Sequence, residues 1–441
     1  MNKSPVSFTD ILSVFQRLTE IQRFWIAYSG GLDSSVLLHL LSTNRDQLDS
    51  DIIAIHVNHQ ISKNSDVWTK HCEITCEQLG IELKKITIDA SNPEGTGPEA
   101  HARQLRYDAI RQLIDNNDVL LTAHHQDDLA ETFILQLMRG AGPEGLAGIP
   151  LIIPFGIGWI MRPLLGYTRK QLEDYARNNN LEWVEDESNL DLDIDRNFVR
   201  KNVMPCLEQR WPAATRTIAR SARHQSDMIE ILKEIAVLDF EKVRCNTNDS
   251  LNIAEFKKLS ESRQKNLLRY WFRLNGHSLP SNNIIRHILS GIINARNDSM
   301  PLIQWKDTEI RRYRDKIYIM KPSGNTVDGY TWHMETPLTF EWGSLHAKPV
   351  TGRGVRASSI IDNTIEVRFR AGGEKIYPVG RHETHKLKKL FQETGIPPWR
   401  REKIPLLYIN NQLAAVPGYW IDKKFNTGEN EAGWEITLLE H

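Results

Sequence analysis

Several features that would assign this chain to a familiar class are scarce. It has only four cysteines in 441 residues, at positions 72, 76, 206 and 245. These are too few for a disulfide framework and fit a reducing compartment. No apolar run approaches the about 18 residues of a membrane-spanning helix, and the first ten residues, MNKSPVSFTD, lack the apolar core of a signal peptide. We therefore expect a cytoplasmic protein.

The chain also lacks an excess of charge of either sign. It holds 55 Lys and Arg residues against 56 Asp and Glu residues, so its net charge is −1. Any contact with nucleic acid must then depend on local patches of cations. The apolar share of 40% is that of an ordinary globular protein, and a chain of 441 residues is long enough for roughly two or three domains.

A glycine-rich turn follows the first apolar run of the chain. Residues 24–28 (FWIAY) predict a strand, residues 29–35 read SGGLDSS, and residues 36–41 predict a helix. A turn between a strand and a helix N-terminus presents backbone N–H groups to an anion such as phosphate. No Gly-Lys-Ser/Thr follows, so this is not a Walker loop. The alternative is a simple glycine turn with a Ser or Asp that caps the helix.

The side chains of this turn suit a metal-bound phosphate. We expect positive φ at Gly30 and Gly31, which would let the backbone approach a phosphate closely. Ser29 and Ser34 supply hydroxyl donors. Asp33 would repel a bare phosphate, so its presence predicts a metal ion between the two.

Strand and helix patterns alternate through the first part of the chain. Further strands are predicted at residues 52–57, 81–88 and 119–123, and further helices at residues 65–79, 98–114 and 127–138. This order predicts a doubly wound parallel sheet with helices on both faces. Ligands of such sheets bind beyond the carboxyl ends of the strands.

The alternation stops near Trp211, and the composition changes again after residue 320. We therefore predict three domains. Residues 1–212 form the α/β domain, residues 213–325 a mostly helical domain, and residues 326–441 a small domain rich in β-strands. The segment KPSGN at residues 321–325 is the predicted linker between the last two.

Two motifs that follow predicted strand ends carry histidine and arginine. Residues 56–59 (HVNH) could lie beside the base or ribose of a nucleotide, although histidines at strand ends are often structural. Arg103 and Arg106, in the segment EAHARQLRY, are spaced to share one helix face. Two guanidinium groups there could hold triphosphate oxygens, or they could form a solvated basic face.

The densest polar motif is HHQDDLAET at residues 124–132. Asp128 and Glu131 share one helix face, where they could bind Mg²⁺, or hold a cationic substrate and take a proton from its amine. The alternative is a favourable interaction of acids with the helix dipole. A zinc site shared by His124 and His125 is disfavoured, because adjacent side chains point apart.

Two further segments follow this motif. Residues 139–148 (RGAGPEGLAG) contain four glycines and predict either a loop over the site or an ordinary connection. Arg196 and Arg200, in RNFVR, are spaced by four residues and suit the phosphates of a polyanion.

Together, the strings SGGLDSS, HVNH, EAHARQLRY, HHQDDLAET, RGAGPEGLAG and DESNLDLDIDRNFVR resemble the bacterial tRNA(Ile)-lysidine synthetase family of PP-loop ATP pyrophosphatases. Near the C-terminus, RFRAGGE, HKLKKLFQE and IPPW resemble further segments of that family. The resemblance implies that ATP adenylates the C2 oxygen of the wobble cytidine in an isoleucine tRNA with the anticodon CAU. The ε-amine of free L-lysine then displaces AMP. It also implies a catalytic domain of the adenine-nucleotide hydrolase type, with ATP and Mg²⁺ as cofactors.

The resemblance implies roles for individual residues. Asp128 and Glu131 would hold the lysine amines, and one of them would take a proton from the ε-amine. Arg106 would assist catalysis, and it and the Arg196–Arg200 pair would contact the triphosphate or the tRNA. Asp33 would bind Mg²⁺. The ATP-binding loop would consist of Ser29, Gly30, Gly31, Leu32, Asp33 and Ser34.

The C-terminal segment supports a tRNA partner by its charge. Residues 368–403 hold ten cations and four acids, a local net charge of +6 in a chain whose net charge is −1. Interleaved Tyr377, Phe391 and Trp399 suit stacking on bases, or they belong to a core. In this segment the predicted tRNA-binding cations are Arg368, Arg370, Lys386, Lys388 and Lys389, in addition to Arg196 and Arg200.

Three other functions remain to be weighed. A tRNA thiolase would need paired cysteines, but the sequence has no C-x-x-C, and the spacing of Cys72 and Cys76 favours core packing on a helix. A nucleotide sensor or tRNA-binding module without activity would not need three acids in these motifs. Asparagine and GMP synthetases are disfavoured because no cysteine follows Met1. The sequence leaves open whether the protein is a monomer or a homodimer.

Overall fold

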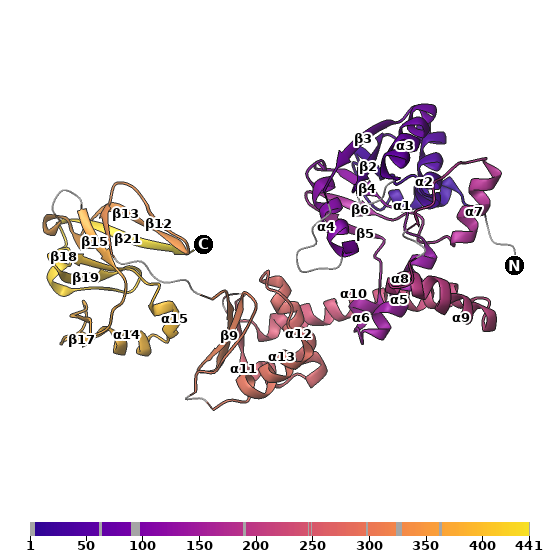
Figure 1. Ribbon diagram of the computed structural model, residues 1–441. Helices are drawn as coiled ribbons and strands as arrows, with labels where there is room; N and C mark the ends of the chain where they lie inside the picture. The colour runs from indigo at the N-terminus through magenta and orange to yellow at the C-terminus, as the bar shows by residue number, and fades with distance from the viewer. Residues whose placement is uncertain are drawn as a thin grey trace. The chain divides into compact units, whose positions relative to one another are not determined.

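The computed structural model divides into two compact units, residues 1–235 and residues 236–441 (Figure 1). The described residues are 5–60, 64–89, 98–187, 191–245, 247, 249–296, 299–322, 329–360 and 364–440. Most of the predicted linker at residues 321–325 therefore lies outside them, as do residues 188–190 of the DESNLDLDIDRNFVR segment.

The first unit is built on a six-stranded sheet, which confirms the predicted doubly wound fold. Every neighbouring pair is parallel except the last, β6 with β5. The hairpin formed by those two strands was not anticipated. In sheet order the strands are β3 (Glu82–Thr87), β2 (Asp51–Asn58), β1 (Arg23–Ala27), β4 (Asp118–Leu121), β6 (Gly158–Met161) and β5 (Ile152–Phe155).

Helices cover both faces of this sheet, because alternate strand residues are buried on opposite sides. Phe24 and Ile26 of β1 belong to the core that α1, α2, α3 and α7 cover. Trp25 belongs to the core on the other face, together with Ile110 of α4. The helices are α1 (Phe8–Phe15), α2 (Leu32–Thr43), α3 (Ser65–Leu79), α4 (Pro98–Arg111), α5 (Gln126–Met138), α6 (Pro143–Leu146) and α7 (Arg169–Asn178).

A run of helical segments follows the sheet. It consists of α8 (Asp195–Phe198), a π-helical turn η3 (Val199–Val203), α9 (Met204–Arg210) and the 30-residue α10 (Ala214–Val243). Pro205, at the start of α9, has no N–H to donate to the preceding turn, which accounts for the irregular turn there. Ala219 and Ala222 of α10 pack against Leu129 of α5.

The second unit begins with helices and a small antiparallel sheet. The helices are α11 (Ile253–Lys257), α12 (Glu261–Leu274) and α13 (Asn282–His287), followed by a π-helical turn η4 (Ile288–Ile293). In sheet order the strands are β7 (Ser250–Asn252), β10 (Lys316–Met320), β9 (Thr308–Tyr313) and β8 (Leu302–Trp305). The prediction of a mostly helical region is confirmed between residues 214 and 293. The sheet was not anticipated, because its strands have only three to six residues each.

The rest of the second unit is rich in β-strands, as predicted. One sheet has the order β11 (Tyr330–His333), β15 (Thr364–Arg368), β18 (Leu406–Ile409), β19 (Gln412–Val416) and β20 (Trp420–Ile421). The other has the order β12 (Leu338–Phe340), β13 (Gly343–Thr351), β21 (Ala432–Glu440) and β14 (Val355–Arg356). Leu345, Val367 and Leu407 belong to the core that the two sheets share. Beside them lie the hairpin β16 (Lys375–Ile376) and β17 (His385–Lys386) and the helices α14 (Leu387–Glu393) and α15 (Pro398–Arg401).

None of the helices in the described part of the chain combines the length and the apolar character that crossing a membrane requires.

Candidate active site

The predicted anion-binding turn connects β1 to α2. The Ser34 hydroxyl donates to the Gly31 carbonyl over 3.0 Å and lies 3.1 Å from the Ser29 hydroxyl. On the outer side, the Val184 N–H donates to the Gly30 carbonyl over 2.9 Å. No side chain caps the N-terminus of α2. The N–H groups of its first turn have no partner within the helix, so they are available to an anion.

The two glycines of this turn have different conformations. Gly30 has a φ of +80°, which favours glycine, and a Cβ there would lie 3.1 Å from Cys72 Sγ. Gly31 has a φ of −77° and a ψ of 165° and occupies the N-cap position of α2. The predicted positive φ at Gly31 is therefore wrong, because an N-cap residue adopts the extended conformation. Leu32 is buried, so only its backbone can contact a ligand.

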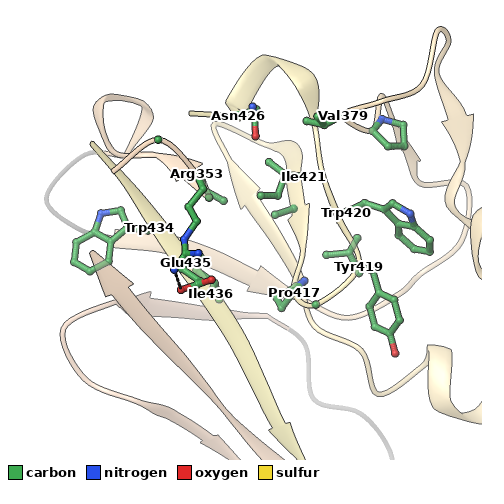
Figure 2. A pocket seen from close by; sticks show the side chains of 17 residues that line it. Arg353, Val379, Pro417, Tyr419, Trp420, Ile421, Asn426, Trp434, Glu435 and Ile436 are labelled. Atoms are coloured by element: carbon green, nitrogen blue, oxygen red, sulfur yellow. Dashed lines mark hydrogen bonds and ion pairs between the residues drawn. The ribbon is translucent and has the colours of Figure 1, made fainter. Parts of the chain in front are cut away.

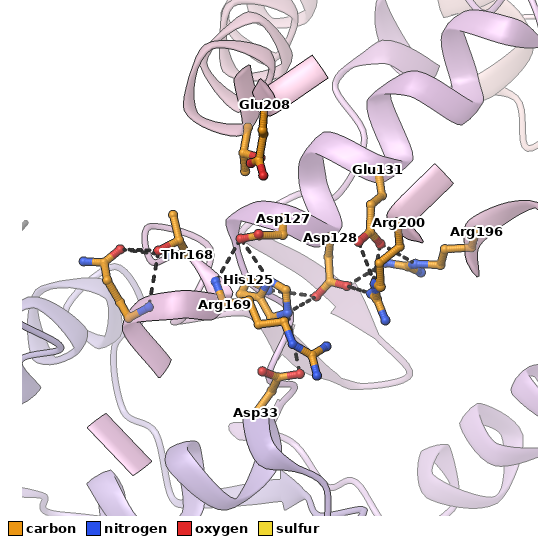
Figure 3. Close-up of polar contacts among 12 residues, drawn as sticks. Asp33, His125, Asp127, Asp128, Glu131, Thr168, Arg169, Arg196, Arg200 and Glu208 are labelled. Atoms are coloured by element: carbon orange, nitrogen blue, oxygen red, sulfur yellow. Dashed lines mark hydrogen bonds and ion pairs between the residues drawn. The ribbon is translucent and has the colours of Figure 1, made fainter. Parts of the chain in front are cut away.

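A buried histidine links this turn to α5 (Figure 3). His125 is the N-cap residue of α5, and its side chain is 1% exposed. Its Nε2 lies 3.5 Å from Asp33 Oδ2 and 3.6 Å from Asp128 Oδ2, and its Nδ1 lies 3.6 Å from Asp127 Oδ2. One imidazole thus faces three carboxylates, one from the turn and two from the first turn of α5.

The three carboxylates keep His125 protonated. Burial alone would lower the pKa of His125, but Asp128, Asp127 and Asp33 raise it to about 10. In turn, burial would raise the pKa of Asp128, but His125 and Arg196 hold it well below its usual range. His125 is therefore an imidazolium near neutral pH, held among carboxylates.

We expect the free energy of unfolding to fall as the pH rises from about 6.5 towards 10. The folded-state pKa of His125 lies above the unfolded value of 6.5. Its stabilisation is therefore complete below pH 6.5 and is lost as the pH rises through the folded-state pKa. The loss should be on the order of a few kcal/mol. Urea unfolding at pH 6.5, 8 and 9.5 measures it.

The variant His125→Gln is the control for this titration. It should be less stable than the wild type at pH 6.5, and its stability should change less between pH 6.5 and 9.5. Equal slopes in the two proteins would show that another group causes the pH dependence.

The other end of the site is a network of two acids and two arginines. Arg200 Nε lies 2.7 Å from Glu131 Oε1, and Arg200 Nη2 lies 3.1 Å from Asp128 Oδ1. Arg196 Nη2 lies 2.9 Å from the same Asp128 oxygen, and Arg196 Nε lies 3.2 Å from Glu131 Oε2. Glu131 is 2% exposed. The segments RNFVR and HHQDDLAET, predicted separately, thus meet as paired charges.

Arg106, another predicted site residue, lies beside the end of β2 and outside this network of acids and arginines. Arg106 Nε donates to His59 Nε2 over 2.8 Å. Burial and the nearby Arg106 charge lower the pKa of His59 to about 4, so the ring is neutral. His56 is buried, and its Nδ1 donates to the Tyr28 carbonyl over 3.0 Å. His56 therefore has the structural role that the sequence left open.

The predicted C-terminal cations differ in their surroundings. Arg368 donates to both carboxylate oxygens of Glu366, at 2.6 and 2.7 Å, and Arg370 Nε lies 3.6 Å from Glu374 Oε2. Lys386, Lys388 and Lys389, in contrast, are exposed on β17 and α14. Arg368 is therefore paired with an acid outside the +6 segment, whereas the exposed lysines, which also include Lys375, carry much of the accessible charge of the segment.

The aromatic residues of the same segment belong mostly to the core. Phe391 is fully buried and Trp399 is 8% exposed. A pocket does occur in this part of the chain, between the loop before β20 and the strands β14 and β21 (Figure 2). Tyr419, Trp420 and an ion pair of Arg353 with Glu435 contribute to its walls. None of the predicted tRNA-binding cations lines it.

The two cysteines predicted to pack in the core, Cys72 and Cys76, are buried, whereas Cys206 is exposed and Cys245 is partly exposed. Cys72 and Cys76 of α3 are 0% and 1% exposed, and burial raises the pKa of each thiol to about 12. Over the described residues, no three His, Cys, Asp or Glu side chains form a group that could hold a metal ion.

Two features of this site were not predicted from the sequence. The first is the charge of His125. Its signal was a histidine at the start of the predicted helix, two and three residues before Asp127 and Asp128, but from the sequence we weighed His125 only as a possible zinc ligand. The second is Arg162, a buried arginine that directly follows β6. Its signal was an isolated cation after the apolar run GWIM, at the sheet edge where ligands bind.

Comparison with known proteins gives a consistent result over nearly the full length of the chain. A PP-loop domain model matches residues 5–207, a TilS substrate binding domain model matches residues 251–318, and a TilS substrate C-terminal domain model matches residues 365–438. The tRNA(Ile)-lysidine synthase of Coxiella burnetii is 38% identical over 432 residues, covering 97% of this chain and 96% of that protein. The enzyme of the same name from Legionella pneumophila (strain Lens) is 40% identical over 425 residues, covering 95% and 96%.

Among solved structures, the U34-tRNA thiolase NcsA from Methanococcus maripaludis matches with a TM-score of 0.42 and 19% identity. The match covers 49% of this chain and 77% of that one.

Proposed function

This chain belongs to the tRNA(Ile)-lysidine synthase family, and we propose that Asp33, Asp128 and Glu131 form the centre of its active site. It is an ATP-dependent ligase that acts on tRNA. The reaction adenylates the C2 oxygen of the wobble cytidine with release of pyrophosphate. The lysine ε-amine then attacks the activated carbon and expels AMP, which leaves lysidine. We further propose that the tRNA is the isoleucine tRNA with the anticodon CAU, and that the enzyme works in the cytoplasm.

The turn at residues 29–34 binds the β- and γ-phosphates of ATP in this proposal. The free N–H groups at the start of α2 and the Ser29 and Ser34 hydroxyls supply neutral donors for a pyrophosphate leaving group. Stabilising that group as it leaves favours attack at the α-phosphate.

The residues of the turn fit Mg²⁺. Asp33 Oδ1 is buried and has no hydrogen-bond partner, and a carboxylate oxygen is a preferred ligand of this ion. Since no further acid among the described residues is grouped with Asp33 as a ligand set, phosphate and water oxygens would complete the coordination. The ion would neutralise charge on the triphosphate.

Asp128 and Glu131 bind the amines of free L-lysine in this proposal. Their carboxylates are paired with Arg196 and Arg200, so lysine must take the place of at least one guanidinium. Phosphates of ATP or tRNA give the displaced arginines an equally good partner. The substrates therefore exchange partners with an existing ion network, and no charge needs to be left unpaired.

The same exchange prepares a base for the second step. The ε-ammonium of lysine must lose a proton before it can attack. While His125 and Arg196 hold the pKa of Asp128 low, this carboxylate is a poor proton acceptor. Movement of the arginine towards a phosphate would raise its basicity. Of the two steps, only the second needs this change.

The second unit binds the body of the tRNA through exposed cations in this proposal. Lys386, Lys388 and Lys389 are placed to contact phosphates, and binding through them should weaken as the salt concentration rises.

One observation carries the assignment of the site. The His125 imidazolium lies 3.5 Å from Asp33 of the phosphate turn and 3.6 Å from Asp128 of the proposed amine site. Only this one side chain therefore separates the two parts of the proposed active site. This is the proximity that an adenylation followed by an amine attack requires.

The test is an amino-acid screen with the full-length protein, ATP, Mg²⁺ and unmodified transcript of the isoleucine tRNA. AMP and modified tRNA should accumulate with L-lysine, and ornithine and arginine should be poor substitutes. Transcripts whose wobble base is changed from C to U serve as the control. Amine incorporation at the same rate with other amino acids would contradict the assignment of lysine.

A further inference from the structure

Arg162 is a buried cation that directly follows β6. It is 5% exposed, and no carboxylate among the described residues forms an ion pair with it. Its Nη1 donates to the Pro150 carbonyl over 2.6 Å, and its Nε is buried without a partner. Keeping an unpaired charge out of water is costly for a protein, so such a group is expected to serve a ligand.

The position of Arg162 in the sheet places it near the phosphate turn. Leu121 of β4 is in register with Ile26 of β1 and with Met161 of β6. Arg162 follows β6 directly, so it lies at the same sheet edge, two strands from the turn that follows β1. Two strand spacings are about 10 Å. A bound ATP molecule can span this distance, and so can the tRNA phosphates next to the wobble cytidine.

The surroundings of Arg162 are cationic or neutral. Burial lowers the pKa of its guanidinium, and Arg103 of α4 adds to that effect, while Tyr107 opposes it. Arg103 lies over the Tyr107 ring at 5.1 Å. His124 is neutral, because burial lowers its pKa to about 3; Asp128 opposes this shift, and Arg162 and Arg103 add to it. The acids of the site lie on α2 and α5, and within the described part of the chain none of them forms an ion pair with Arg162.

We infer that Arg162, with Arg103 beside it, forms an anion subsite that binds a phosphate group of a substrate. The inference rests on the proposed function. Two sources offer the same chemistry, the triphosphate of ATP and a phosphodiester of the tRNA next to the wobble nucleotide. In either case the free protein stores an uncompensated charge that the substrate neutralises.

The variant Arg162→Met tests this inference in the full-length protein. In the free protein its Tm should equal or exceed that of the wild type, because removal of a buried unpaired charge is often neutral or stabilising. The Pro150 carbonyl belongs to an exposed residue and can be hydrated instead. Substrate binding should weaken at least about tenfold. Arg162→Lys should restore part of the binding, since it keeps the charge.

Two measurements identify the phosphate. If ATP is the ligand, the rise in Tm caused by ATP without tRNA should shrink in Arg162→Met, and the KM for ATP should rise. If the tRNA is the ligand, the ATP effect should stay, and the KM for tRNA should rise at constant kcat.

Arg312 provides a matched control, because it is also buried and donates to the backbone carbonyls of Ile292 and Ile293. Arg312→Met should lower the Tm and leave the ATP effect unchanged. The inference is overturned if Arg162→Met behaves in this way. The measurement of Tm with and without ATP does not require the enzyme to form product, so it tests the inference even if the wild type forms no lysidine.

Discussion

The variant Asp33→Ala is expected to form AMP from ATP and tRNA about a thousandfold more slowly than the wild type, while its binding of tRNA persists. Asp33 lies at the start of α2, inside the turn that we assign to the leaving pyrophosphate, and its Oδ1 is buried without a partner. Loss of one group that stabilises charge in the transition state typically costs about a hundred- to a thousandfold in rate. Formation of radiolabelled AMP, with tRNA binding measured by filter retention, tests both parts.

Asp33 could affect the rate through the phosphate turn or through its contact with His125, and the control must distinguish these two effects. Asp33 and Asp127 both face the His125 ring, at 3.5 and 3.6 Å, but only Asp33 belongs to the turn. Asp127→Ala should therefore retain much more activity than Asp33→Ala. Equal losses in the two variants would mean that the effect passes through the imidazolium. AMP formation near the wild-type rate in Asp33→Ala with Mg²⁺ would contradict the assignment of Asp33.

The order of strands and helices in the first unit could be predicted because each element has a strong local signal. Residues 24–28 are wholly apolar, and the glycines that follow break the strand at one place. The predicted helix at residues 65–79 coincides with α3, and Gly80, with a φ of +63°, caps its C-terminus. Such signals depend only on neighbouring residues, so one sequence suffices.

The partners of the site residues could not be predicted in the same way. Arg200 and Glu131 are 69 residues apart, and their contact depends on how the helical segments that follow the sheet pack against α5. From the sequence, HHQDDLAET and RNFVR each suggested a charged ligand. A sequence shows every charged residue but does not show which opposite charge it contacts in the fold. The same reason applies to the C-terminal segment, where Arg368 and Arg400 pair with Glu366 and Asp249, two acids that lie outside the residues counted for the charge of +6.

Removal of charge from Asp128 or Glu131 is expected to raise the KM for lysine by at least about thirtyfold. Truncating or neutralising one partner of a buried, hydrogen-bonded charge pair costs about 2–5 kcal/mol, and 2 kcal/mol corresponds to about thirtyfold. Asp128→Asn and Glu131→Gln preserve the shape of the side chains. Steady-state rates at varied lysine concentration, with ATP and tRNA saturating, measure the effect.

The ion network makes the ATP response of these variants diagnostic. In the wild type, Arg196 and Arg200 are held by Asp128 and Glu131. Loss of one carboxylate frees guanidinium donors for phosphates, so the KM for ATP should stay unchanged or fall. Adenylation of tRNA without lysine should persist for the same reason.

Asp127→Asn is the matched control, because Asp127 also lies in the first turn of α5 but accepts from the Arg169 N–H. If the KM for ATP rose tenfold while that for lysine stayed constant, Asp128 and Glu131 would instead be ligands of ATP or its metal.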